Sequence, residues 1–528
     1  MVLMNTHRLW FSASTTMVGS ICGLFLSLAL CAEDVGATSY YISPTGKDTN
    51  AGISIGSPWL TFTKALATMR CGDTLNLMDG MYGDGTRTGK PYVRNMTCTS
   101  GAVLTVRSLN QRKAWIKDAG RGRSLIVYSS AYVTVDGIVM SSKDSNYDSG
   151  AYEQNGMPLY VYASHHIVIK NVVLSNPNRY GNLPLLQLTS VSDILIEDSE
   201  LYNFHRHAIN TSPGTRVTIR RVYCNPRIGG LSGGYPNANG TNGGDACIAL
   251  YPCQNCIVEN VIADGYPKSL HLIELNANGQ APLAGNKILG SIGYKTGHNG
   301  IYINSRGTGL MKMPQNTTLE NVVIYNHRQA NAIRNSDAKN TVIKNVTLVG
   351  AGSAKGILID QSGYGDGAYS TTMQNALSLN HTNYGVSVSG VSTWSGNEVN
   401  SHNNRYVAYP VPPAKWTNLT TSNPALGACT VWIPDGSPMK RAGVGGADVG
   451  ANVLYRYQNG VLTNVALWNK STGAFPHGAL VPRLNNIAGQ SLYDVHIRLN
   501  INRNGCSFPA AYKNSATALA APTSVTSF

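Results

Sequence analysis

Ile167-Val-Ile-Lys-Asn-Val-Val-Leu174 is one copy of a short pattern that recurs through the middle of the 528-residue chain. Two runs of mostly β-branched residues flank a single polar residue, Asn171. β-branched residues favour strands, and asparagine tolerates the left-handed backbone that a tight corner requires. The stretch therefore predicts a short strand, a corner and a second short strand.

Further copies of this pattern begin at Val133, Ile194, Val217, Cys256, Thr318 and Thr341. Their corner residues are Gly137, Asn171, Asp198, Arg221, Asn260, Asn321 and Asn345, with Ser291 in a weaker copy. Successive corners lie roughly 23 to 39 residues apart, which is a solenoid period. Because stacked asparagines can hydrogen-bond from one repeat to the next, we expect this column to be structural.

A third short strand precedes many of the copies. Examples are Ala208-Ile-Asn-Thr, Cys247-Ile-Ala-Leu, Leu272-Ile-Glu-Leu, Gly300-Ile-Tyr-Ile, Ala332-Ile-Arg-Asn and Gly356-Ile-Leu-Ile. Three strands and three turns per repeat describe a coil of a parallel β-helix, with neighbouring coils about 4.8 Å apart. The sequence thus predicts an all-β solenoid in which the isoleucines point inward and the residues after them point outward.

The two ends resemble secreted right-handed parallel β-helix proteins of the pectate-lyase-like superfamily. The resemblance rests on Tyr40-Tyr-Ile-Ser-Pro-Thr-Gly, Ser57-Pro-Trp and Gly72-Asp-Thr-Leu at one end, and on Ser437-Pro-Met and Gly446-Ala-Asp-Val-Gly-Ala451 at the other. It implies a right-handed β-helix over residues 39–455, with an N-terminal capping helix at 62–69. The superfamily holds lyases, hydrolases, epimerases and binding proteins, so this likeness specifies a fold and leaves the activity open.

The flanking segments predict an exported protein. Residues 1–32 have the pattern of a signal peptide, with His7 and Arg8 before an apolar run. We expect a secreted or extracytoplasmic protein with no membrane-spanning segment after signal removal; a lipid anchor at Cys31 is the minor alternative. Residues 456–514 are expected to form a C-terminal cap or small attachment segment, and 515–528 a disordered tail.

Charge and cysteine content point to a partner and a compartment. The formal net charge of +14 favours a polyanion, and we expect an acidic polysaccharide rather than a nucleic acid. Outside the leader the chain has Cys71, Cys98, Cys224, Cys247, Cys253, Cys256, Cys429 and Cys506. An even number in an exported chain favours disulfides, and for Cys253-Gln-Asn-Cys256 we expect a disulfide or buried thiols rather than zinc.

Chemically active residues gather on and around the third strands. As catalytic residues we single out Asp245, His271, Glu274 and Lys268, and as substrate-binding residues Arg206, His207, Asn210, Tyr251, Asn276, His298, Tyr302 and Arg334. Acids, imidazoles and cations would share one face, and tyrosines could stack on sugar rings. The insertions at 225–244 and 307–315 are expected to wall this face as a groove.

Two kinds of cleavage remain open. Gly244-Asp-Ala-Cys-Ile-Ala-Leu250 resembles the Gly-Asp-Asp-Cys-Val-Ala-Ile stretch of polygalacturonase-type glycoside hydrolases, with Ala246 in place of their second aspartate. This likeness implies that Asp245 is a general acid, and Glu274 is the nearby candidate for the base that inverting hydrolysis requires. In a lyase, His271 or Lys268 would instead remove a proton beside a uronate carboxylate held by Arg206 and Arg334.

A third possibility is a non-catalytic β-helix that binds glycan or builds the cell envelope. A calcium ion is possible in the lyase case, although no dense aspartate cluster announces one, and the metal requirement stays open. Phosphate-loop, nucleophile-elbow and zincin motifs are absent from the sequence. We therefore expect a carbohydrate-active protein that leans towards an enzyme, either a polysaccharide lyase or a glycoside hydrolase.

Overall fold

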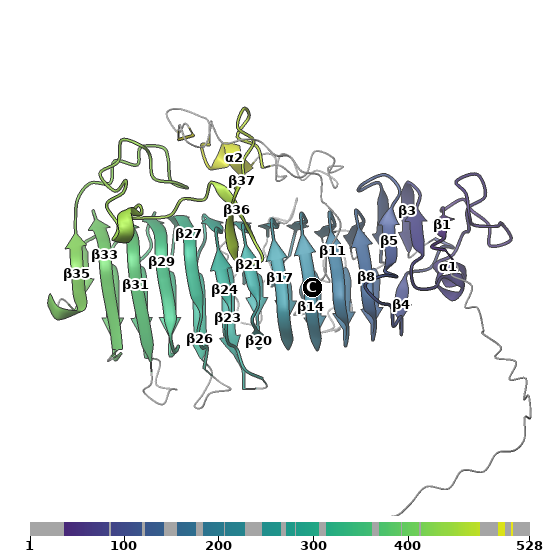
Figure 1. Ribbon diagram of the computed structural model, residues 1–528, viewed down its shortest axis with the longest axis horizontal. Coiled ribbons are helices and arrows are strands. Elements are labelled where there is room, and N and C mark those ends of the chain that lie inside the picture. The colour runs from purple at the N-terminus through teal and green to yellow at the C-terminus, as the bar shows by residue number, and fades with distance from the viewer. Residues whose placement is uncertain are drawn as a thin grey trace, which may run out of the picture. The chain divides into compact units, whose positions relative to one another are not determined.

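The computed structural model describes residues 36–501, 508 and 509, except 84–85, 119–121, 142–155, 176–182, 205, 227–244, 266–270, 280, 306–312, 362–368, 392, 411–412 and 476–494. The predicted signal segment, with Cys31, and the tail 515–528 lie outside the described residues, as do Lys268 and Cys506. Nearly all described strands pair in parallel, and they stack as the coils of a β-helix (Figure 1). The predicted fold class is confirmed.

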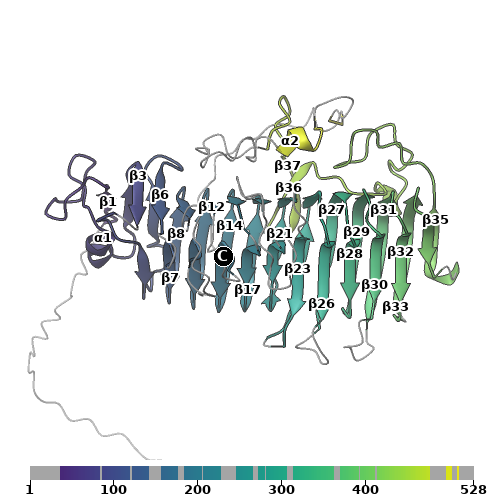
Figure 2. The same cartoon turned by 180° about the vertical axis from the view of Figure 1, so that it is seen from behind.

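One face of the coils is a 12-stranded parallel sheet, which we call the site sheet. Its strands β23 to β32 run side by side in Figure 2. In spatial order they are β4 (Tyr92–Arg94), β7 (Leu125–Tyr128), β10 (Leu159–Tyr162), β13 (Leu186–Thr189), β16 (His207–Thr211), β19 (Ala246–Leu250), β23 (His271–Ala277), β26 (Asn299–Ser305), β28 (Asn331–Ser336), β30 (Lys355–Asp360), β32 (Tyr384–Ser389) and β34 (Tyr406–Tyr409).

The remaining parallel strands form the other sides of each coil. They are β1 (Ser39–Ile42), β2 (Thr74–Leu77), β3 (Gly80–Gly83), β5 (Leu104–Ser108), β6 (Ala114–Lys117), β8 (Ala131–Asp136), β9 (Val139–Ser141), β11 (His165–Lys170), β12 (Val173–Ser175), β14 (Val191–Glu197), β15 (Glu200–Tyr202), β17 (Gly214–Arg220), β18 (Tyr223–Asn225), β20 (Cys253–Gln254), β21 (Ile257–Glu259), β22 (Ile262–Asp264), β24 (Lys287–Leu289), β25 (Ile292–Tyr294), β27 (Thr318–His327), β29 (Thr341–Gly350), β31 (Ser370–Leu379), β33 (Thr393–His402) and β35 (Trp416–Thr420).

The core fills the inside of the coils. The six predicted inward isoleucines pair in one register column and are completely buried. They are Ile209, Ile248, Ile273, Ile301, Ile333 and Ile357. Each buried isoleucine side chain stabilises the fold by about 1.5–3 kcal/mol, so this stack fixes the register of the site sheet.

A short helix, α1 (Phe62–Thr68), lies at the N-terminal end of the stack near β1 and β4 (Figure 1). Thr61 caps it by accepting a hydrogen bond from the Lys64 N–H, at 3.1 Å. Phe62 and Ala65 are buried and belong to the main core. The helix is thus present where the sequence predicts one, and its role in closing the coil stack stays a prediction.

The corner column is confirmed with one correction. Asn171, Asn260 and Asn321 all have positive φ, between 52° and 55°. In the weaker copy the left-handed corner is Gly290, with φ 54°, and not Ser291 as the sequence suggested. Glycine adopts positive φ without steric strain, which explains why the corner lies at Gly290 rather than at the next residue.

The C-terminal segment packs along the side of the coils, where β36 (Tyr455–Gln458), β37 (Val461–Ala466) and α2 (Val495–Arg498) lie beside strands β21 to β27 (Figure 1). Trp432, Trp468 and Phe475 are buried there against Tyr223 and other outward residues of the coils. Tyr457 ties the segment to two corners: its N–H donates to Asn260 Oδ1 at 2.6 Å, and its hydroxyl accepts from Asn321 Nδ2 at 2.7 Å. An attachment role for 456–514 remains a prediction.

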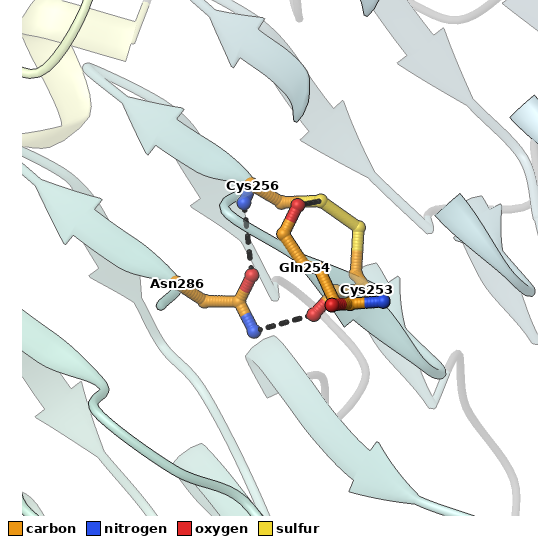
Figure 3. Close-up of a disulfide and its surroundings, with 4 residues drawn as sticks. All are labelled: Cys253, Gln254, Cys256 and Asn286. Carbon is orange, nitrogen blue, oxygen red and sulfur yellow. Dashed lines mark hydrogen bonds between the residues drawn. A yellow bond between two sulfur atoms is a disulfide. The ribbon is translucent and has the colours of Figure 1, made fainter. Parts of the chain in front are cut away.

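Disulfides join Cys71 to Cys98, Cys224 to Cys247 and Cys253 to Cys256. Cys429 is also disulfide-bonded. The Cys253–Cys256 disulfide bridges a turn (Figure 3). Asn286 of the next coil holds this turn with two hydrogen bonds of 2.9 Å: its side chain accepts from the Cys256 N–H and donates to the Cys253 carbonyl. Cys253 and Cys256 thus form a disulfide, which is one of the two alternatives expected from the sequence.

Among the described residues, no helix has the length and apolarity to cross a membrane.

Candidate functional site

The site is built across three neighbouring strands of the site sheet. His207, Ala246 and His271 share one register column, and Asn210, Ala249 and Glu274 share another. The middle strand, β19, contributes only alanine to both columns, so long side chains of β16 and β23 can meet above it. The cluster thus depends on small residues whose importance the sequence alone did not reveal.

His207 lies at the centre of the cluster and is completely buried. Its Nδ1 is 3.0 Å from Asn210 Nδ2, while its Nε2 is 3.7 Å from Glu274 Oε2 and 3.9 Å from Asp245 Oδ2. Nε2 has no hydrogen-bond partner among the described residues. A buried polar atom without a hydrogen-bond partner costs about 1–3 kcal/mol.

Glu274 is a buried carboxylate that the cluster keeps ionised. Tyr251 OH donates to its Oε2 at 3.1 Å, and Asn276 Nδ2 donates to its Oε1 at 2.8 Å. Burial by itself would raise the pKa of Glu274, but contact with His207, the positive charge that the neighbouring imidazoles carry in acid and the hydrogen bond from the Asn276 amide hold that pKa at about 2. Glu274 is therefore negatively charged at neutral pH and is not a proton donor there.

His271 has its tautomer fixed by the backbone. Its Nδ1 contacts the carbonyl oxygen of Asn299, which only accepts hydrogen bonds, so Nδ1 carries the proton and Nε2 is left as the acceptor. Burial lowers the pKa of His271 below 6.5, so the ring is neutral at pH 7. The rings of Tyr302 and His298 lie 5.9 and 5.8 Å from it.

Two cations border the cluster. Arg206 Nε is 3.7 Å from Asp245 Oδ2, and the carboxylate of Asp245 is about one-third exposed. The Arg334 guanidinium lies over Tyr302, 5.5 Å from the ring centroid, and its Nη2 donates to Asp360 Oδ2 at 2.8 Å. Arg334 was predicted from the sequence to bind substrate, but its charge is already offset by Asp360, one coil further on, which the prediction did not include.

The structure brings together all the described residues that the sequence singled out. Three of them differ from the role predicted for them, which was contact with substrate. His207 is completely buried, and Tyr251 and Asn276 donate hydrogen bonds to Glu274. The carbonyl of Asn299 was missed, since a backbone group leaves no signal in a residue pattern. Lys268 and most of the two expected loop walls lie outside the described residues.

The Cys224–Cys247 disulfide lies directly beneath the site. It joins β18 to β19, the strands on either side of 227–244, and Cys247 is two residues from Asp245. The Asp245 N–H also donates to the Arg206 carbonyl at 2.7 Å, and the His271 N–H donates to the Asp245 carbonyl at 2.8 Å. Backbone and disulfide together fix the position from which the Asp245 side chain leaves the sheet.

The described residues hold no metal cluster, and one apolar hollow lies away from this site. In the described part of the chain, no group of three His, Cys, Asp or Glu side chains could hold a metal ion. A hollow of about 290 Å³ lies on another face, over β8, β11, β14 and β17, and is lined mainly by apolar side chains. Its acid, Asp193, is paired with Arg216 at 2.6 Å, so the hollow lacks the acid–base arrangement of the site sheet.

No protein-family model and no curated protein matches the chain. Among solved structures, the pectate lyase Pel9A matches at 14% identity, over 79% of this chain and 96% of its own, with a TM-score of 0.42. The Dettilon tailspike protein matches at 11% identity over 74% and 70%, with a TM-score of 0.47, and PfbA, a surface adhesin of Streptococcus pneumoniae, at 14% over 64% and 86%, with a TM-score of 0.38. At such identities, only the chain's own side chains bear on its activity.

Proposed function

We propose that the chain binds an acidic polysaccharide along the site sheet and cleaves it by β-elimination, with His271 as the base. The observation that carries this proposal is the contact of His271 Nδ1 with the Asn299 carbonyl, which holds the ring proton on Nδ1 and leaves the Nε2 lone pair as the acceptor. Burial, which lowers the pKa of His271, keeps the ring neutral at neutral pH. A general base for neutral pH needs this state. The net positive charge of the chain favours an anionic substrate, and Arg206 is the nearby cation that would meet it.

In the proposed reaction His271 Nε2 removes the proton from the carbon next to a uronate carboxylate. The electron pair of that C–H bond forms a carbon–carbon double bond, the glycosidic C–O bond breaks, and the leaving oxygen takes up a proton from water, while His271 later releases its proton to water. Arg206 would offset the charge that develops on the carboxylate. Glu274, ionised beside His271, raises the pKa of the imidazole and so opposes the effect of burial on its basicity.

Hydrolysis is the second candidate, and one observation favours it. Asp245 and Glu274 approach the same nitrogen of His207, at 3.9 and 3.7 Å, so the two carboxylates face each other across one imidazole. A carboxylate pair is what most glycoside hydrolases use. Because Glu274 is ionised, it would be the base or nucleophile, and Asp245 the acid.

The test is to incubate the full chain with polygalacturonate, alginate, hyaluronate and starch, each with and without EDTA. Elimination produces ultraviolet-absorbing unsaturated ends together with reducing ends, whereas hydrolysis produces reducing ends alone. We expect absorbance from an acidic polymer and its loss in His271→Gln, with His165→Gln on β11 as the matched control. Reducing ends without absorbance would contradict elimination in favour of hydrolysis, and binding without either product would leave a glycan-binding protein.

A further inference from the structure

Four tyrosines form a continuous patch on the N-terminal part of the site sheet. The tyrosine patch consists of Tyr92 on β4, Tyr128 on β7, and Tyr160 and Tyr162 on β10. The Tyr128 and Tyr162 rings stack at 5.4 Å, Tyr160 and Tyr162 at 5.9 Å, and Tyr92 meets Tyr128 edge-on at 6.3 Å. Tyr92 and Tyr128 are 42% and 37% exposed, so their rings face solvent.

The patch is continuous with the candidate site. Tyr160 pairs in register with Gln187, and Gln187 with Asn210, which contacts His207. Tyr92 stands six strands from Glu274 in the same sheet, or about 29 Å at about 4.8 Å per strand. A polymer laid along the coil axis through the site would therefore run over the tyrosines.

Two arginines give the patch a positive charge. The Arg123 guanidinium lies 4.1 Å from the centroid of the Tyr160 ring, and that of Arg94 lies 5.6 Å from the centroid of Tyr92. The Nε of Arg123 is buried and has no hydrogen-bond partner within the described residues. Arginine side chains beside tyrosine rings of this kind suit a ligand that offers both apolar sugar faces and carboxylates.

We propose that the tyrosine patch is a distal subsite that binds sugar rings of an acidic polysaccharide whose cleaved bond lies at the site. Tyr92 and Tyr128 would stack on the ring faces, and Arg94 and Arg123 would pair with carboxylates. This inference rests on the proposed function for the identity of its ligand. It implies that long chains bind more tightly than short ones, because only a long chain spans both places.

The experiment measures binding and cleavage separately. The Tyr92→Ala/Tyr128→Ala double variant and a matched Tyr132→Ala control are each prepared in a His271→Gln background, which prevents cutting. Tyr132 is a tyrosine of β8 that stacks on His166 at 4.4 Å, outside the site sheet. Dissociation constants are measured by affinity electrophoresis in gels containing polygalacturonate, alginate or hyaluronate.

We expect the double variant to bind its polymer at least about tenfold more weakly, and Tyr132→Ala to bind as the background does. With His271 intact, the double variant should lose more activity on the polymer than on the trisaccharide of the same sugar. Unchanged binding would overturn the subsite and leave the proposed function standing. Tyrosine-dependent binding without cleavage would overturn the function and leave the subsite, and no binding to any of the three polymers would overturn both.

Discussion

The corner column and the site sheet are built in the same way, by stacking one position of the repeat over its equivalent in the next coil. They differ in how their polar groups are satisfied. Asn375 Nδ2 donates to Asn345 Oδ1 at 2.9 Å, and Asn260 bonds to Tyr455, Tyr457 and Gly290. In the site sheet, His207 Nε2, Asn210 Oδ1 and Asn276 Oδ1 are buried without hydrogen-bond partners among the described residues.

This difference separates stability from function within one fold. A satisfied polar stack rigidifies the coils, whereas a buried donor or acceptor without a hydrogen-bond partner lowers stability. Such atoms also occur elsewhere in the described chain, as at Thr317 and Trp432, but in the site sheet three of them lie in one cluster. Variants in the corner column should therefore lower the free energy of unfolding and leave activity unchanged. Variants in the site sheet should lower activity and leave the free energy of unfolding nearly unchanged.

The largest expected effect is that of His271→Gln. If His271 is the base, kcat falls by about 10²- to 10⁴-fold, which is the usual contribution of general base catalysis. The glutamine amide can still donate to the Asn299 carbonyl, so the melting temperature should stay close to that of the wild type. Activity within tenfold of the wild type would remove His271 from the proposed role.

Asn260→Gly should have the opposite profile. Glycine keeps the left-handed corner, but the change removes the hydrogen bonds to Gly290 and Tyr455 and from Tyr457. The free energy of unfolding, measured in urea, should fall by about 2–4 kcal/mol with activity preserved. Asn255→Gly, at another corner of the same coil, is the control and should change less; an equal loss in both would refute the distinction.

Buried histidines of the coil interior offer a pH test. Burial lowers the pKa of His327 to about 3 and that of His381 to about 4. In the unfolded chain both have a pKa near 6.5, so between about pH 6.5 and 4 the unfolded state binds more protons and stability falls with falling pH. His327→Gln/His381→Gln should flatten this slope in urea unfolding at pH 7.5, 6 and 5, and an unchanged slope would contradict the assignment to these two histidines.

The smallest effect is expected at an exposed corner pair. Arg216 Nε and Nη2 donate to Asp193 at 2.6 and 2.7 Å, but the arginine side chain is 57% exposed. Water and salt screen such a pair, so Asp193→Asn should lower the free energy of unfolding by less than about 1 kcal/mol. A loss comparable to that of Asn260→Gly would show that corner ion pairs matter more than the comparison implies.

Much of the fold was predictable because the same residue types recur in the sequence once per coil. The isoleucine stack from Ile209 to Ile357 and the asparagine corners recur at each coil, and each reports a local requirement for burial or for positive φ. Gly290 was misassigned because two residues at that corner, glycine and serine, both suit a turn. The C-terminal segment had no repeat, so its packing against Tyr223 and Asn321 could not be inferred.

The candidate site was predictable as a set of residues and not as an arrangement. Alternation along the strand placed Glu274 on the outward face, next to the inward Ile273, whereas Asp245 and His271 could be placed only at the strand entrance. That Ala246 and Ala249 leave room for His207 between the two carboxylates depends on the register between strands. Only the completed sheet defines that register.

The coil, the inward stack and the face that carries chemically active residues thus follow from short-range periodicity in the sequence. Contacts between coils set which groups are ionised, which are held by hydrogen bonds and which lack a partner among the described residues. Glu274 is ionised because His207, His271 and Asn276 surround it, and His271 is neutral because it is buried against Asn299. Such states depend on distances between coils and on the exclusion of water, and neither can be inferred from the sequence of a single repeat.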